Sequence, residues 1–191
     1  MSVVSVALSQ EHKFSKTSLS SITLLPGLGV KGDCHCGVTD QHSSRLHIKP
    51  PPYNLRQVHL IHAELFEEVS RSSDGTKFSV QPGQLGENIT TAGIDLLELS
   101  TGTKLHFVGD LQAGLDVEHP VVMITGLRNP CSQIDRFQKG LKEKCLLRDS
   151  ERKITGRKAG VMSIVKVGGE VKNGAIIIVE KPERFKALEC V

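Results

Sequence analysis

The stretch GVMSIVKVGGEVKNGAIIIV, residues 160–179, decides the fold class of this chain. It contains two apolar runs rich in β-branched residues, Gly160–Val167 and Ala175–Val179, each of strand length. Gly168-Gly169 is a hairpin signal, and Lys172-Asn173-Gly174 marks a second turn. The stretch therefore predicts short strands that follow one another through tight turns.

Similar patterns recur along the rest of the chain. They predict further strands at Val3–Leu8, Ser20–Leu25, Gln57–Ile61, Asn88–Thr91, Asp95–Leu99, Leu105–Val108 and Val121–Thr125. Two segments, Ala63–Arg71 and Ile134–Leu147, carry apolar residues at helical spacing. Many short strands with two helices favour a mainly β fold, a β-barrel-like closed sheet with a few peripheral helices. Since no linker or repeat interrupts the pattern, residues 1–191 are expected to form one domain.

The composition limits the classes of function. The net charge is only +3, and the chain has no Trp and one Tyr, so it lacks the basic, aromatic surface of a nucleic-acid binder. No apolar run approaches the about 20 residues that a membrane span requires. The first ten residues lack the pattern of a signal peptide, and five cysteines cannot all pair internally. We therefore expect reduced thiols and a cytoplasmic location, with neither nucleic acid nor membrane as a partner.

Cys131 is the strongest candidate for chemistry. It ends the sequence Arg128-Asn129-Pro130-Cys131, between a predicted strand and a predicted helix. The positive end of a helix, with Arg128 nearby, should favour thiolate over thiol, the form required of a metal ligand or a sulfur carrier. The other interpretation is a buried structural cysteine. We take Cys131, Arg128 and Asn129 as the catalytic candidates.

A second cluster, Asp33-Cys34-His35-Cys36, is followed by His42 and His47 in a long irregular segment. Two cysteines and up to three histidines within residues 34–47 are typical of a zinc site, although a Cys-x-Cys spacing is not the usual one. A zinc-bearing structural or interaction protein is therefore one hypothesis. The others are that His35 and His42 line a pocket, or that they are ordinary surface histidines.

Two further elements suit ligand binding. Glu87 and Asn88 follow two glycines and start a strand, where both are poor strand formers. Arg157 and Lys158 precede Gly160, and paired cations at such a place suit a phosphate, although a charged loop explains them equally well. The whole segment 128–158 has ten basic and four acidic residues, which indicates either a solvated face or a wall that faces an anionic ligand.

In this order and spacing the motifs resemble the MOSC family, named for the C-terminal domain of molybdenum cofactor sulfurases. The resemblance runs from about Val3 to Pro182, and the chain is similar to a small stand-alone member. The residues that carry it are Gly32-Asp33-Cys34-His35, Asn54-Leu55-Arg56-Gln57-Val58, Pro82-Gly83 with Gly86-Glu87-Asn88, Arg128-Asn129-Pro130-Cys131 and Arg157-Lys158-Ala159-Gly160-Val161.

The resemblance implies a β-barrel-like MOSC fold that binds the molybdenum cofactor, molybdopterin. It implies that Cys131 ligates molybdenum or carries sulfur. The cofactor-binding candidates by position are His35, His42, Glu87, Asn88, Arg157 and Lys158. Two functions follow: an oxidoreductase that reduces small N-hydroxylated substrates, or a persulfide carrier or cofactor-delivery module. The first requires an electron-donor protein and the second a sulfur-donor protein.

Overall fold

The computed structural model describes residues 1–42, 45–71, 76–109 and 118–191. The strands are β1 (Ser2–Leu8), β2 (Thr17–Leu19), β3 (Ser21–Leu25), β4 (Gly29–Val30), β5 (Val58–His62), β6 (Ile89–Ala92), β7 (Lys104–Val108), β8 (Val121–Leu127), β9 (Leu146–Arg148), β10 (Ile154–Arg157), β11 (Val161–Val167), β12 (Gly169–Lys172) and β13 (Ile176–Glu180). The helices are α1 (Glu64–Ser70), the 3-10 helix η2 (Leu96–Glu98), α2 (Ser132–Phe137) and α3 (Leu141–Lys144). Every predicted strand except Asp95–Leu99 overlaps an observed strand.

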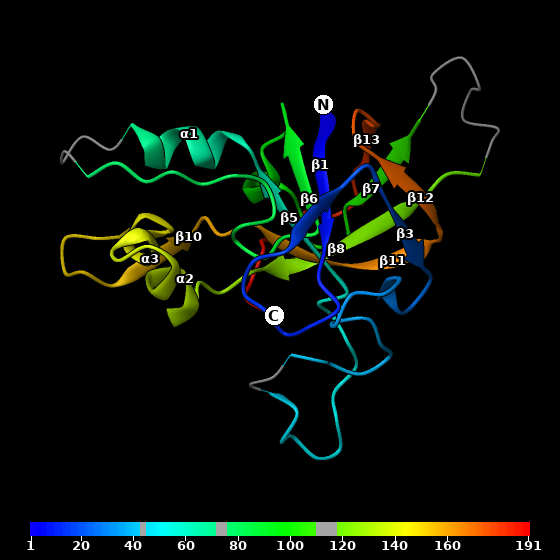
Figure 1. Ribbon diagram of the computed structural model, residues 1–191, viewed down its shortest axis with the longest axis horizontal. Coiled ribbons are helices and arrows are strands. Elements are labelled where there is room, and N and C mark those ends of the chain that lie inside the picture. The colour runs from blue at the N-terminus through cyan, green and yellow to red at the C-terminus, as the bar shows by residue number, and fades with distance from the viewer. Residues whose placement is uncertain (43–44, 72–75, 110–117) are drawn as a thin grey trace.

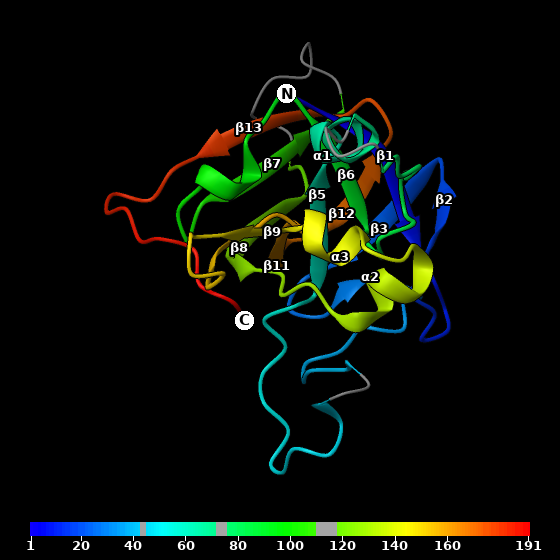
Figure 2. The same cartoon turned by 90° about the vertical axis from the view of Figure 1, so that its left-hand side faces the viewer.

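The strands close into a barrel, which confirms the mainly β prediction. The order is β13-β7-β8-β11-β5-β6-β1, and β1 returns to β13 through the pairing of Ser2 with Ile176. β5 and β6 run parallel, and the other neighbours in the barrel run antiparallel. β2 extends β1, and β12, β3 and β4 form a separate sheet. Figures 1 and 2 show the barrel with the short helices outside it.

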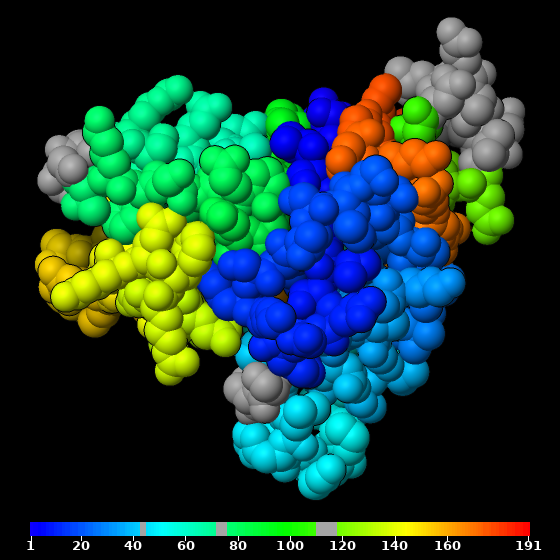
Figure 3. All heavy atoms as spheres, viewed as in Figure 1, coloured from blue at the N-terminus to red at the C-terminus, as the bar shows by residue number. Residues whose placement is uncertain are grey.

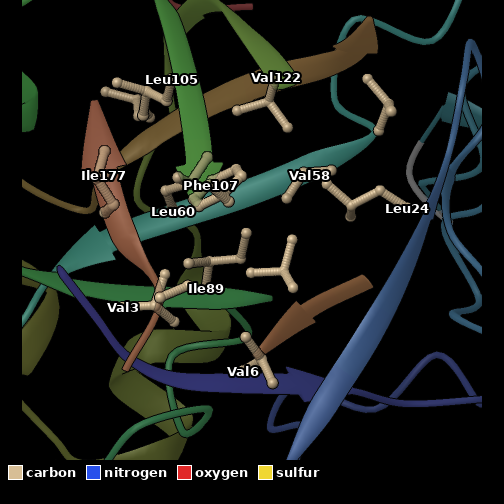
Figure 4. Packing of buried hydrophobic residues seen from close by; sticks show 14 of the residues in the cluster. Val3, Val6, Leu24, Val58, Leu60, Ile89, Leu105, Phe107, Val122 and Ile177 are labelled. Atoms are coloured by element: carbon tan, nitrogen blue, oxygen red, sulfur yellow. The ribbon is translucent and has the colours of Figure 1, made fainter. Parts of the chain in front are cut away.

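The barrel interior is apolar because alternate residues of each strand point inward. Figure 4 shows side chains from different strands meeting there, among them Val3, Leu60, Phe107 and Ile177. These four are at most 2% exposed. Packing of this kind fills the barrel interior with apolar side chains, so a polar functional site is expected at its rim.

A second apolar cluster joins the helices to the barrel. Leu65, Phe66 and Val69 form the buried face of α1, as their spacing predicts. Ile134 of α2 and Cys145 pack in the same cluster. Figure 1 shows α1, α2 and α3 on one side of the barrel, with β3 and β12 on the other. None of the helices in the described ranges is long and apolar enough to cross a bilayer.

The prediction of one helix over Ile134–Leu147 is wrong. The helix α2 ends at Phe137, and Gly140, with φ of +90°, redirects the chain into the short α3. A left-handed residue cannot continue a right-handed helix, and only glycine adopts it without strain. The strand predicted at Asp95–Leu99 is also wrong, since the side chain of Asp95 caps η2 by accepting the N–H of Leu97 at 3.1 Å.

The predicted hairpin at Gly168-Gly169 is wrong as well. β11 pairs with β5 and β8, whereas β12 pairs with β3 in the other sheet. Gly169, with φ of +138°, turns the chain out of the barrel instead of folding it back on β11.

Candidate functional site

A pocket opens at the barrel rim, beside α2. Five predicted site residues line it: His35, His42, Arg128, Asn129 and Cys131. The other lining residues are His12, Lys13, Phe14, Asp40, Gln41, Asn54, Arg56, His59, Gly86, Gln133 and Met162. They come from the segment after β1, the long segment between β4 and β5, the turn before β6, the strands β5 and β11, and α2 with the β8–α2 connection. Figure 3 shows these segments, blue, cyan and yellow-green, meeting on one face of the molecule.

Cys131 is the N-cap residue of α2, with extended backbone and a half-buried side chain. This confirms the expectation that the thiol directly precedes a helix. The backbone N–H of Arg128 donates to the carbonyl of Gly160 at 3.0 Å, which holds the connection against β11. Sγ of Cys131 lies 3.7 Å from Oε1 of Gln133. The thiol is therefore held in place by the backbone and faces the pocket.

Two arginines bring positive charge into the pocket with donors left unpaired. Nη1 of Arg128 and Nε of Arg56 are buried and lack a hydrogen-bond partner among the described residues. Burial lowers the pKa of both guanidinium groups, but a guanidinium stays charged at neutral pH. A buried donor without a partner costs on the order of 1–3 kcal/mol, and more when it is charged. The pocket is therefore suited to an anionic, oxygen-rich group.

His35 is positioned by a buried carboxylate. Oδ1 of Asp33 lies 3.1 Å from Nδ1 of His35 and accepts the backbone N–H of His35 at 3.0 Å. Oδ2 accepts from Nζ of Lys16 at 2.6 Å and from Nδ2 of Asn88 at 3.0 Å. Burial alone would raise the pKa of Asp33, but the bond to His35 and the ammonium of Lys16 hold it well below its usual range. Asp33 is thus ionised and fixes the imidazole at the pocket wall.

Two further histidines of the pocket lining, His42 and His59, are neutral at physiological pH. Burial, with Arg56 nearby, lowers the pKa of His42 to about 4. Burial, with Arg128 nearby, lowers the pKa of His59 well below its usual value. Nε2 of His59 lies 2.8 Å from the carbonyl oxygen of Ala159, so Nε2 carries the proton. These rings add hydrogen-bonding groups to a cationic pocket without adding charge.

Glu87 and Asn88, predicted to bind the cofactor, are fully buried away from the pocket. The carboxylate of Glu87 accepts backbone N–H groups of Gly83 at 2.5 Å and Leu85 at 3.2 Å, and so fixes the turn before β6. Oδ1 of Asn88 accepts the N–H of His59 at 3.2 Å. The two side chains are polar because backbone groups inside the fold need partners.

Arg157 and Lys158 also lie outside the pocket lining. Nζ of Lys158 pairs with Glu68 of α1, so this charge is already neutralised. Nε of Arg157 donates to Oδ1 of Asn129 at 3.2 Å. Arg157 therefore acts on the pocket through Asn129, by orienting a residue that does line it.

Sequence reasoning missed Arg56, His59 and His12 as site residues. Arg56 belongs to a motif that carries the family resemblance, and His59 is a polar residue inside the apolar strand β5. The sequence therefore contained an indication for each of them. His12 left none, because it reaches the pocket from an ordinary polar loop. Cys34 and Cys36 do not line the pocket, and burial, with the carboxylate of Asp33, raises the pKa of both thiols.

Comparison with known proteins agrees with this architecture. The YuaD protein from Bacillus subtilis matches with a TM-score of 0.70 at 19% identity, over 95% of this chain and 96% of that chain. YiiM from Geobacillus stearothermophilus matches with a TM-score of 0.59 at 15% identity, over 94% and 75%. YiiM from Escherichia coli matches with a TM-score of 0.58 at 16% identity, over 98% and 73%. No curated protein sequence matches the chain significantly.

The structural likenesses, at such identities, show the fold alone. The family comparison goes further, because the MOSC domain family matches residues 40–177, well over half of the chain. This range contains the two arginines with unpaired donors, Arg56 and Arg128, together with Cys131. The chain therefore belongs to the MOSC domain family.

Proposed function

We propose that this chain binds the molybdenum cofactor in the pocket, with Cys131 as the protein ligand of molybdenum. The MOSC family is associated with this cofactor. The observation that carries the proposal is the pair of buried, unpaired donors, Arg56 Nε and Arg128 Nη1, in the pocket that Cys131 lines. An anionic group with several oxygens in this pocket would give both guanidinium groups a partner.

Each pocket residue then has a definite task. Arg56 and Arg128 would bind the anionic oxygens of the cofactor, and the thiolate of Cys131 is a soft ligand that suits molybdenum. Asn129 is oriented by Arg157 at 3.2 Å and offers a neutral amide beside the thiol. The neutral rings of His42 and His59 can accept or donate hydrogen bonds to uncharged parts of the ligand.

The reaction we propose is the reduction of an N-hydroxylated substrate. When bound, the cofactor supplies two-electron chemistry with transfer of an oxygen atom. The balance is R–NHOH plus two protons and two electrons to R–NH2 plus water, so an electron-donor protein has to deliver the two electrons. The free thiols of the five cysteines fit a cytoplasmic setting for this chemistry.

A second candidate function, sulfur transfer, is favoured by the surroundings of Cys131. Its side chain is half-buried, and its Sγ makes only a long, weak hydrogen bond to Gln133 within the described part of the chain. Such a thiol could attack the outer sulfur of a persulfide on a sulfur-donor protein, which leaves as a thiolate, and Cys131 would then hold a persulfide that the pocket presents to a cofactor.

The deciding measurement is the molybdenum content of protein purified from cells that make the cofactor. The cofactor proposal expects near-stoichiometric molybdenum in the wild type and its loss in Cys131→Ser. Cys190→Ser, which changes an exposed cysteine outside the pocket, is the matched control and should keep the metal. Loaded protein would then be assayed on N-hydroxylated bases with a chemical electron donor.

Wild-type protein without molybdenum would contradict the cofactor proposal. Cyanide-labile sulfur on Cys131 in that same protein would instead support the sulfur carrier. Absence of both molybdenum and labile sulfur would refute the two candidates together.

A further inference from the structure

Three potential metal ligands meet at the rim of the pocket. One ring nitrogen of His12, one of His35 and Sγ of Cys34 all lie within 4.8 Å of one another. Nδ1 of His35 is 3.2 Å from Sγ of Cys34, and the rings of His12 and His35 meet edge to face at 5.3 Å. Neither the cofactor proposal nor the family match, which begins at residue 40, uses this cluster. We propose that His12, Cys34 and His35 bind one zinc ion at the rim of the pocket.

Local structure explains how Cys34 and His35, which are adjacent in sequence, can both reach one ion. The N–H of Cys36 donates to the carbonyl of Asp33 at 3.0 Å and closes a β-turn. Cys34 and His35 are the central residues of that turn, so their side chains diverge less than they would in a strand, where neighbours point to opposite faces. A carboxylate oxygen of Asp33 also accepts the N–H of His35 at 3.0 Å, which fixes the turn in this form.

The segment that carries the third ligand, His12, is held by two hydrogen bonds of the Ser9 backbone. The N–H of Cys34 donates to the carbonyl of Ser9 at 2.8 Å, and the N–H of Ser9 donates to Oδ2 of Asp33 at 3.2 Å. These bonds bring the segment after β1 against the turn. His12, three residues further along, is exposed, so its side chain can rotate toward a bound ion without disturbing the core.

The donor types and distances suit zinc. In a tetrahedral zinc site the ligand atoms are about 3.3–3.6 Å apart, because Zn–N is about 2.0 Å and Zn–S about 2.3 Å. The Cys34–His35 separation of 3.2 Å is already close to this value, and the 4.8 Å limit for the whole set leaves at most about 1.5 Å for His12 to close. Nitrogen and sulfur donors exclude the hard cations Mg²⁺ and Ca²⁺.

The surroundings complete a zinc-type site. Zinc at Nδ1 of His35 would replace the proton that this nitrogen shares with Asp33 at 3.1 Å, and the carboxylate would then lie beside the ion as a counter-charge. Binding replaces the thiol proton of Cys34 by Zn²⁺ and releases that proton to solvent. Three protein ligands would leave a fourth position of the zinc open for water or another ligand.

The ligand set differs from the one that the sequence suggests. The cluster expected between Cys34 and His47 would use Cys36, but in the described part of the chain the convergent residues are His12, Cys34 and His35. Cys36 sits in the same turn and stays out of the group. It therefore provides a matched control.

The test is zinc binding by purified, metal-free protein, measured by competition with a chromogenic chelator. Wild type, Cys36→Ser and Cys131→Ser should each bind one zinc per chain with the same affinity. Cys34→Ser and His12→Asn should bind at least tenfold more weakly, and His12→Asn changes an exposed loop residue that leaves the fold intact. Co²⁺ bound in place of zinc should show a thiolate charge-transfer band that is lost in Cys34→Ser.

Wild-type protein that binds no zinc would overturn the proposal. So would zinc that survives Cys34→Ser but is lost in Cys36→Ser or Cys131→Ser. Because Cys131→Ser removes molybdenum but is expected to keep zinc, failure of this site and failure of the proposed function give different results.

Discussion

The buried guanidinium of Arg128 should weaken the ligand-free protein while it strengthens ligand binding. Nη1 of Arg128 is buried without a partner among the described residues, and the residue is 9% exposed. Methionine has a similar aliphatic stem and no charge. Arg128→Met should therefore remove an unsatisfied donor and raise the free energy of unfolding of the ligand-free protein by about 1 kcal/mol. For a chain of this size that corresponds to a melting temperature higher by about 2–4 °C.

The same substitution should abolish loading with the cofactor. The loss of one charge-assisted contact and of much of the pocket's positive charge should reduce the bound molybdenum at least tenfold. Urea unfolding of the ligand-free protein gives the stability, and elemental analysis of protein from cofactor-producing cells gives the occupancy. Arg184→Met, at an exposed position, is the control and should change the unfolding free energy by less than about 0.5 kcal/mol. A variant that loses about 2 kcal/mol without ligand and still loads normally would show that Arg128 is structural, and would refute this reasoning.

Three further perturbations test the packing around the pocket. The pKa of His42 is about 4 in the folded protein and 6.5 for an unperturbed histidine, so the unfolded chain binds its proton first and stability should fall as pH drops from 6.5 to 4. A shift of this size is worth about 3 kcal/mol for a fully buried group. Solvent screens the half-buried ring of His42, so His42→Gln should reduce the fall by about 1 kcal/mol in urea titrations. Asp33→Asn leaves the buried ammonium of Lys16 without its counter-charge, and should lose about 3–5 kcal/mol by urea unfolding, unless Lys16→Met is made as well. Gly160→Ala should destabilise more than Gly174→Ala in thermal melts: both glycines have φ above +80°, but a Cβ at Gly160 would clash with a β5 carbonyl, whereas one at Gly174 meets nothing within 4 Å. Equal losses in the two glycine variants would show that backbone strain, not the clash, sets the effect.

The helix predictions show where local pattern fails. Ile134 is buried as its helical spacing indicates, but the helix does not reach Leu147, because Gly140 takes a left-handed conformation. Apolar periodicity reports which residues face the core and says little about where the backbone turns between them. At Asp95 a side-chain cap competes with strand formation, and the cap prevails because the following leucine is buried by η2.

The site predictions also succeed within one local motif and fail where other elements supply the partners. Cys131, Arg128 and Asn129 lie within one short motif between a strand and a helix, and the structure brings all three to the pocket. Glu87 and Lys158 have equally suitable chemistry, but one satisfies backbone N–H groups and the other pairs with Glu68. Whether a polar side chain faces a ligand or the protein depends on partners from other elements, which no local pattern contains.

The sequence by itself determined the seven barrel strands and the mainly β class, and it singled out Cys131, which the structure places at the pocket. These depend on alternation, turn residues and a short motif, all of which act over a few neighbouring residues. Closure of the barrel through Ser2 and Ile176, the unpaired donor of Arg128, and the meeting of His12 with the turn at Cys34 were decided only by the tertiary structure. The physical reason is that burial and charge pairing depend on contacts between segments far apart in the chain, and these contacts exist only once it has folded.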